Sequence, residues 1–253
     1  MTQHRLILAA AIAAFLTASP VLAQQADAAR LNEHVRVLAS DEFEGRGVAT
    51  PGEQLTVDYL VGQFQALGLE PGGPDGQWVQ AAQLGRTRQD GPAAIVVAAN
   101  DEIRTLARGP DVLVSSDRPV NHISIAGAEV VFAGYGVSAP ERGGDDFKGM
   151  DLRGKVLLVI VNDPDFGAPE GHPVAGRFDG NAMTFYGRWP YKFQEAARQG
   201  AAAVLVIHDT AGAGYGWSVL EGSSTAPKFD IVRADPDAER VPAQGWIQGS
   251  VAE

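Results

Sequence analysis

Apolar runs and helical patterns alternate clearly along residues 150–209. Residues 156–161 form an unbroken apolar run rich in β-branched side chains, which is typical of a strand buried on both faces. Residues 193–197 place apolar side chains at helical spacing, and Gly200 follows them where a helix would end. A second apolar run covers residues 204–207. The order strand, helix, strand predicts a parallel pair joined by a right-handed crossover.

The turn before the first of these strands contains Gly154, in the segment DLRGK. A turn at this place favours a residue that tolerates positive φ. Asn162, Asp163 and Pro164 follow the apolar run and would end the strand. We therefore expect Gly154 to be a structural turn residue.

Two amphipathic helices are predicted near the N-terminus, over residues 27–39 and 53–67, with Asp27 and Thr50 as their N-caps. Each helix has one apolar stripe, so each needs a surface that covers it. The stripes comprise Leu31, Val35 and Leu38 in the first helix and Val57, Leu60, Val61, Phe64 and Leu67 in the second.

Short strands separated by turn residues follow from residue 93 onward, a texture typical of all-β or α+β folds. The predicted strands cover residues 94–98, 112–115, 122–125, 129–134 and 241–247, and long loops are expected at 166–182 and 209–229. We place a domain boundary near residue 85. The whole pattern predicts an α+β (mixed α/β) fold, with N-terminal helices, a β-sandwich or open barrel with flanking helices, and a βαβ element.

The first 23 residues have the pattern of a secretory signal peptide. A polar start precedes the apolar core at residues 6–16, which is too short to span a bilayer. Val21 and Ala23 stand at the positions that a signal peptidase reads, so cleavage is expected after Ala23. The protein would then be secreted or periplasmic, and no longer attached to a membrane.

Charge and composition exclude some classes of partner and some kinds of chemistry. The 253-residue chain has a formal charge of −11, which disfavours nucleic acids and anionic membrane surfaces as partners. It has no cysteine, so neither disulfides nor thiolate chemistry are available.

No metal-binding or catalytic motif is apparent in the sequence. Four histidines follow the leader and lack the spacing of a metal site: His34, His122, His172 and His208. Asp163 and Asp165 flank a proline, but the EF-hand calcium pattern fails after the second aspartate. The segment GAGYGW has Trp217 where a dinucleotide-binding motif needs glycine. We therefore assign no catalytic residue, metal ligand or cofactor to this chain.

An aromatic group, Tyr186, Trp189 and Tyr191, lies beside the predicted polar loop. One hypothesis is a rim that contacts peptide or another domain, since aromatic side chains often anchor interfaces. The other hypothesis is that these residues pack the start of a helix onto the sheet.

Several segments together resemble zinc aminopeptidases of peptidase family M28 that carry an inserted protease-associated (PA) domain. These segments are LASDEFEGRGVATPGE, VVFAGYGVSAPE, DDFKGMDLRGKVLLVIVNDPDF, MTFYGRWPYKFQEAARQGAAAVLVIHD and GYGWSV. The resemblance covers roughly residues 30–250. In that family the zinc-binding residues lie after the PA domain.

The resemblance implies that residues 24–84 belong to the catalytic domain's N-terminal end, and that residues 85–253 are a PA domain truncated at its C-terminal end. The full-length protein would release N-terminal amino acids from peptides with two zinc ions. This chain would serve substrate access or positioning without being competent for hydrolysis by itself. Its partners would be a peptide or protein substrate, or the missing catalytic domain. Two alternatives are a stand-alone periplasmic PA-type binding module and a small-ligand binding protein, the latter suggested by the βαβ element and the Gly-rich loop.

Overall fold

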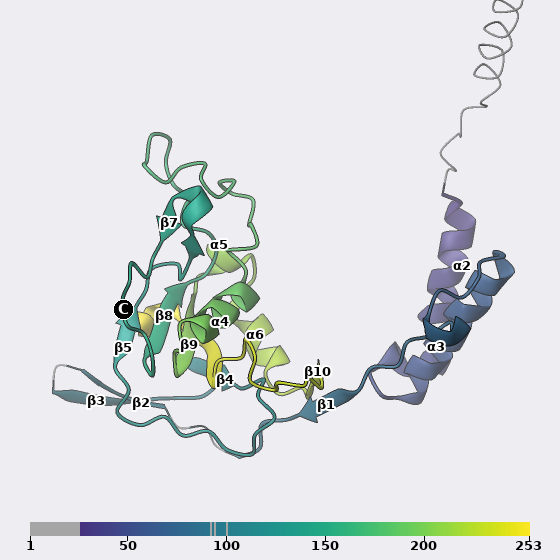
Figure 1. The fold of residues 1–253 in the computed structure, drawn as a ribbon, viewed down its shortest axis with the longest axis horizontal. Helices are drawn as coiled ribbons and strands as arrows, with labels where there is room; N and C mark the ends of the chain where they lie inside the picture. Colours follow the sequence, from purple (N-terminus) through teal and green to yellow (C-terminus); the bar gives the residue numbers. More distant parts are fainter. Residues whose placement is uncertain (1–25, 92, 94, 100) are drawn as a thin grey trace, which may run out of the picture. The chain divides into compact units, whose positions relative to one another are not determined.

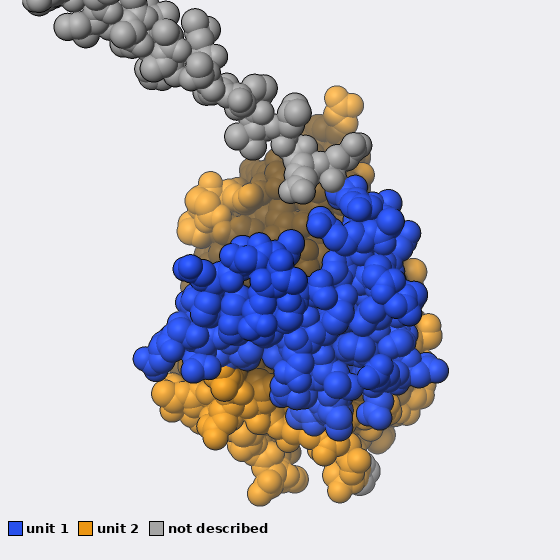
Figure 2. All heavy atoms as spheres, turned by 90° about the vertical axis from the view of Figure 1, so that its right-hand side faces the viewer, with its two compact units in different colours: residues 1–80 blue, residues 81–253 orange. Residues whose placement is uncertain are grey.

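The computed structural model describes residues 26–91, 93, 95–99 and 101–253, so the predicted signal peptide lies outside the described residues. The chain divides into two compact units, Met1–Gln80 and Ala81–Glu253 (Figure 2). Helices and a mixed sheet are both present, and the fold class is α+β, as predicted. Within the described part, no helix combines the length and the apolar character needed to cross a membrane. The assignment of the two units to domains of a peptidase stays a prediction.

Unit 1 is a pair of helices with short 3-10 helices after each. Its elements are α2 (Ala28–Leu38), a 3-10 helix at Asp41–Arg46, α3 (Pro51–Ala66) and a 3-10 helix at Pro74–Gly76. Asp27 caps α2, because its Oδ1 accepts the N–H of Ala29 at 2.9 Å. Thr50 precedes α3 but does not cap it with its side chain, because its hydroxyl donates to the carbonyl of Gly47 at 2.6 Å. Pro51 starts α3 instead, at a position where no N–H is needed.

The small core of unit 1 is centred on Phe43, the buried residue of the 3-10 helix at Asp41–Arg46. Gly52 is required there, since a Cβ at this position would lie 2.1 Å from the carbonyl oxygen of Phe43. Tyr59 packs edge-on against Phe43 and binds His34 Nδ1 through its hydroxyl at 2.7 Å. The predicted apolar stripes are largely uncovered by unit 1 itself, with Leu31, Val35, Leu60, Phe64 and Leu67 all exposed.

A five-stranded mixed sheet forms the centre of unit 2 (Figure 1). The strand order is β4-β11-β9-β8-β5, in which β4 runs antiparallel to β11 and all other neighbours are parallel. The strands are β4 (Val112–Ser115), β5 (Val130–Phe132), β8 (Val156–Ile160), β9 (Ala203–His208) and β11 (Ala243–Gln248).

The predicted strand, helix, strand unit is present as β8, α4 (Trp189–Arg198) and β9. Leu157 of β8 pairs with Val204 of β9 in parallel register, which confirms the crossover prediction. Gly200 ends α4 with φ +72°, and its N–H donates to the carbonyl of Ala197 at 3.0 Å. Gly154 has φ +71° and donates to the carbonyl of Gly200 at 3.0 Å, so the turns before β8 and β9 support each other.

Three two-stranded sheets and three short helices complete unit 2. The sheets pair β1 (Leu84–Thr87) with β10 (Lys228–Ile231), β2 (Ile95–Ala99) with β3 (Glu102–Leu106), and β6 (Ser138–Ala139) with β7 (Gly144–Asp145). The helices are α5 (Thr210–Ala213), α6 (Trp217–Ser223) and α7 (Gly249–Ala252), and a 3-10 helix covers Pro140–Arg142.

Two sequence predictions about unit 2 were wrong. Residues 122–125 form no strand, because no neighbouring strand pairs with them and β-propensity alone does not hold an isolated segment. Residues 209–229 are not one long loop, since they contain α5 and α6. Asp209 starts α5 by accepting the N–H of Gly212 at 2.6 Å, and Trp217 of α6 packs against the main core.

The sheet is covered on both faces. One face packs against α4. The core between them includes Leu157, Val159, Val204 and Val206 from the sheet, and Phe193 and Ala196 from α4. The other face packs against the β2–β3 hairpin and α7. The buried residues of this second core are Val112, Leu205 and Ile247 from the sheet, and Leu106 from β3. Successive residues of a strand point to opposite faces, so one apolar run supplies both cores.

Candidate functional site

The carboxyl ends of β8 and β9 lie at the same edge of the sheet, because the two strands are parallel. Loops at such an edge are the usual place for ligand binding in parallel sheets. The chain after β8 runs through residues 161–188 to α4, and the chain after β9 enters α5 directly. Asn162 joins the two loops by donating from Nδ2 to the carbonyl of Gly212 at 2.7 Å. This edge is therefore the first candidate for a site.

A polar node, made of Asn162, Asp163 and Lys192, lies buried at this edge. The carboxylate of Asp163 is 0% exposed and accepts the N–H and the hydroxyl of Thr184 at 2.6 and 2.7 Å. Lys192 is 1% exposed and donates from Nζ to the backbone carbonyl of Asn162 at 2.9 Å. Asn162 has φ +75°, a conformation that asparagine adopts more readily than most residues. The polar node thus attaches α4 and the loop around Thr184 to the end of β8.

Lys192 has an unusual electrostatic environment. Burial lowers the pKa of Lys192 to about 7, although the neighbouring carboxylates of Asp163 and Asp146 act in the opposite direction. Its Nζ also lies 5.9 Å from the centre of the Tyr135 ring. An amine with such a pKa could serve as a base, but only where a substrate reaches it. Because the side chain is enclosed, it holds the loops together and has no access to a ligand in this structure.

Asp165 organises the next part of the loop. Its Oδ2 accepts the N–H groups of Phe178 and Gly180 at 2.8 and 3.1 Å, while Oδ1 is buried without a partner within the described residues. Asp163 and Asp165, weighed above as a calcium loop, therefore bind separate backbone groups of the loop. In the described part of the chain, no three histidine, cysteine or acidic side chains lie close enough to hold a metal ion.

The three aromatic residues of the predicted rim do not share one surface. Tyr191 is 3% exposed, and its hydroxyl accepts the N–H of Ser138 at 3.1 Å. Burial raises the pKa of Tyr191 to about 12. Tyr186 is half-buried and donates its hydroxyl to Glu141 at 2.5 Å, and Trp189 is 45% exposed at the start of α4. Tyr191 is thus a core residue, while a contact of Tyr186 or Trp189 with a partner stays a prediction.

Phe185 is an exposed aromatic that the sequence prediction left out. Its side chain is 61% exposed, and its ring centre lies 5.3 Å from that of Tyr191. It stands in the run TFYGRW beside the residues that were chosen, so a search for aromatic density alone would have found it. The anchoring of Thr184 by Asp163 positions this run.

The histidines have separate structural surroundings. His208 is buried beside Tyr215, Trp217 and Trp246, and its Nε2 lies 3.0 Å from the carbonyl oxygen of Tyr215. Its neighbour Asp209 points to the start of α5, so the two side chains do not converge on one ligand.

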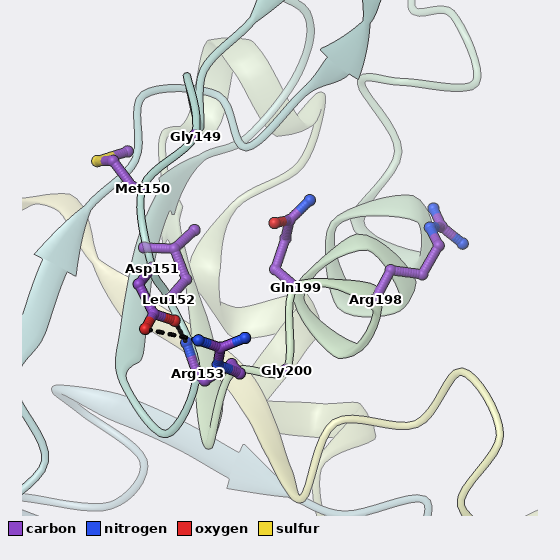
Figure 3. A pocket seen from close by; sticks show the side chains of 8 residues that line it. All are labelled: Gly149, Met150, Asp151, Leu152, Arg153, Arg198, Gln199 and Gly200. Carbon is purple, nitrogen blue, oxygen red and sulfur yellow. Dashed lines mark hydrogen bonds and ion pairs between the residues drawn. The ribbon is translucent and has the colours of Figure 1, made fainter.

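A shallow groove of about 410 Å³ lies between the end of α4 and the turn before β8 (Figure 3). It is lined by Gly149, Met150, Asp151, Leu152, Arg153, Arg198, Gln199 and Gly200. Both arginines already have acidic partners: Arg153 pairs with Asp151 at 2.9 Å, and Arg198 pairs with Glu195 at 2.8 Å. The groove is open and mostly polar, unlike the enclosed apolar pockets that bind small molecules. It also contains none of the residues of the polar node or the predicted rim.

Comparisons with known proteins do not assign this chain to a family. No family model matches the chain, and a search of curated proteins found no match. Among solved structures, the chain is similar to an aminopeptidase from Aneurinibacillus sp. strain AM-1, with 17% sequence identity and a TM-score of 0.33. The alignment covers 88% of this chain and 39% of that one. This chain therefore spans well under half of that structure, and a likeness of this size does not place it in a family.

Proposed function

We propose that this chain is the N-terminal, non-catalytic portion of a secreted metallo-aminopeptidase of the M28 type, in which unit 2 serves substrate access or positioning. The observation that carries the proposal is the set of sequence segments that resemble that family. In the fold, three of these segments make up β5, the turn at Gly154, β8, the polar node, α4 and β9. The three segments therefore lie next to one another in the folded unit 2.

The helices of unit 1 support the same proposal. Leu31 and Val35 of α2 are 55% and 64% exposed, and Phe64 of α3 is 44% exposed. Large apolar side chains that repeat along one stripe of a helix normally pack against another layer of structure. In the proposal that layer is the catalytic domain, to which these helices would belong.

The chemistry would then be supplied by residues outside this chain. Two zinc ions and a carboxylate base would activate water and polarise the peptide carbonyl. The residues of this chain would orient the substrate, and we assign them no bond-breaking step. The mature protein would begin at Gln24 and work outside the cytoplasm, because the leader pattern predicts cleavage after Ala23.

The first experiment is to read the gene beyond codon 253. A continuation with an H-x-D motif and a Glu-Glu pair supports the proposal. The extended protein and the chain ending at Glu253 are then purified side by side and compared for bound zinc and for hydrolysis of aminoacyl-nitroanilides. We expect zinc and turnover in the extended protein alone. Stoichiometric zinc and chelator-sensitive turnover in the shorter chain would contradict the proposal.

The second candidate function is a stand-alone periplasmic PA-type module that binds peptides or proteins. It is favoured by the two-sided core of unit 2, which buries side chains on both faces of the sheet without help from unit 1. A stop codon directly after residue 253 would favour this function over the peptidase.

A further inference from the structure

The edge strand β5 presents unused backbone groups. β5 is the last strand of the five-stranded sheet and pairs only with β8 (Figure 1). On either side of Val131, the carbonyl of Glu129 accepts the N–H of Val156 and the N–H of Ala133 donates to the carbonyl of Leu158, both at 2.9 Å. In a parallel ladder these bonds involve every second residue of a strand. Glu129, Val131 and Ala133 thus face β8, and the backbone N–H and C=O groups of Val130 and Phe132 point away from the sheet.

No described strand pairs with the outer side of β5. The outward N–H and C=O groups of Val130 and Phe132 make no backbone hydrogen bond to another described segment. The preceding residues 121–127 are mostly exposed and run without a strand. Folded proteins usually protect such edges with lysine, proline, a bulge or a covering segment. Here the edge carries two apolar side chains instead, with Val130 44% and Phe132 59% exposed.

We propose that β5 binds an extended, apolar peptide segment as a sixth strand of the sheet. This inference rests on the proposed function, which makes peptides the substrate class, and it names the place where they are held. An extended peptide presents its own N–H and C=O groups at the same two-residue spacing, so it can pair with this edge. A compact ligand does not have donors and acceptors at that spacing. Val130 and Phe132 lie on one face of the strand, so alternate apolar side chains of the peptide would cover them.

A second copy of this chain is the less suitable occupant. β5 has three residues, and two such strands side by side would bury far less than the roughly 1,200 Å² that stable protein dimers need. A short peptide needs no such area when the binding is weak and serves to align a substrate. The few hydrogen bonds that β5 offers correspond to such weak binding.

The test uses the full chain and a blocked peptide, acetyl-Lys-Val-Thr-Val-Thr-Lys-amide, as the probe. Amide hydrogen exchange is followed by NMR as the peptide is added. We expect exchange at the amides of Val130 and Phe132 to slow as the peptide binds, because they would gain acceptors. The amide of Val131 already points to β8, so its exchange should stay unchanged.

Two variants at one position separate the backbone from the side chain. Val130→Pro removes the outward N–H without removing a bond to β8, and should weaken peptide binding about five- to tenfold. Val130→Thr keeps the N–H and the branched shape, and serves as the matched control with binding close to that of the unchanged chain. Urea unfolding checks that both variants fold. If Val130→Pro does not fold, Phe132→Lys places a charge at the edge and should weaken binding in its place.

Three results would overturn the inference: no protection at Val130 and Phe132, equal binding by Val130→Pro and the control, or protection that depends on protein concentration without peptide. The last result would indicate self-association of two copies. The inference and the proposed function can fail separately. Peptide binding at β5 together with a stop codon after residue 253 would reject the peptidase and keep the binding strand. An active zinc peptidase without peptide at β5 would do the opposite.

Discussion

Replacing Lys192 by methionine should remove a defined part of the pH dependence of stability. The ammonium group of Lys192 is enclosed, and its pKa falls from the ordinary 10.5 to about 7 in the folded chain. Below pH 7, both the folded and the unfolded chain carry the proton, and the folded state bears the full cost of the buried charge. Above pH 7, the folded chain releases this proton while the unfolded chain keeps it until about pH 10.5. The unfolded state then binds more protons, so stability rises with pH across this window.

The size of the effect follows from the same two values. A difference between pKa values of 10.5 and about 7 corresponds to about 5 kcal/mol at most, because each pH unit contributes about 1.4 kcal/mol. Between pH 7 and pH 9.5, the free energy of unfolding should therefore rise by roughly 3 kcal/mol more in the unchanged chain than in Lys192→Met. Methionine fills a similar volume but leaves the carbonyl of Asn162 without its donor, which is a constant cost that does not change with pH.

The measurement is urea unfolding of both proteins at half-unit steps from pH 6 to pH 9.5. The difference between the two profiles isolates Lys192, because all other titrating groups are shared. Lys148→Met, at an exposed lysine, is the matched control and should give a profile parallel to that of the unchanged chain. A flat difference between the unchanged chain and Lys192→Met would refute the reasoning, since it would mean that the buried amine titrates as it does in the unfolded chain.

Three further predictions concern two glycines and the independence of unit 2. Gly154→Val should lower the free energy of unfolding by about 1–3 kcal/mol through strain alone, because φ is +71° and an added Cβ meets no atom within 4 Å. Thermal melting checks it, with Gly216→Val as the control, because Gly216 has φ −78° and equally open space around an added Cβ. Gly245→Ala should lower the free energy of unfolding further and disrupt the pairing of β4 with β11, because its Cβ would lie 1.8 Å from the carbonyl oxygen of Leu113. Circular dichroism and thermal melting would show this loss, and an unchanged melting temperature would contradict the prediction. Deleting residues 24–80 should leave unit 2 folded and more soluble, because β1 begins after the deletion and pairs within unit 2; unfolding of the remainder would show that unit 1 is needed.

Local patterns along the chain were sufficient to predict several elements of the fold. The apolar runs around Leu157 and Val204 predicted β8 and β9, since strands buried on both faces cannot alternate with polar residues. Gly200 predicted the end of α4, because the left-handed backbone there suits glycine. The strand at residues 112–115 was predicted with the bounds that β4 has in the structure. These features follow from short-range sterics and from which side chains avoid water.

Other features were decided only by contacts between distant residues. Residues 122–125 have a strand-like composition and stay irregular because no partner strand lies beside them. Tyr191 and Trp189 look alike in the sequence, yet one is in the core and the other is exposed, since their side chains meet different neighbours. The enclosure of Lys192 gave no local signal, because it depends on the loop that returns to Asp163 through Thr184. Burial and pairing partners are properties of the assembled chain, so the tertiary structure alone sets the charge state of Lys192 and the open edge at β5.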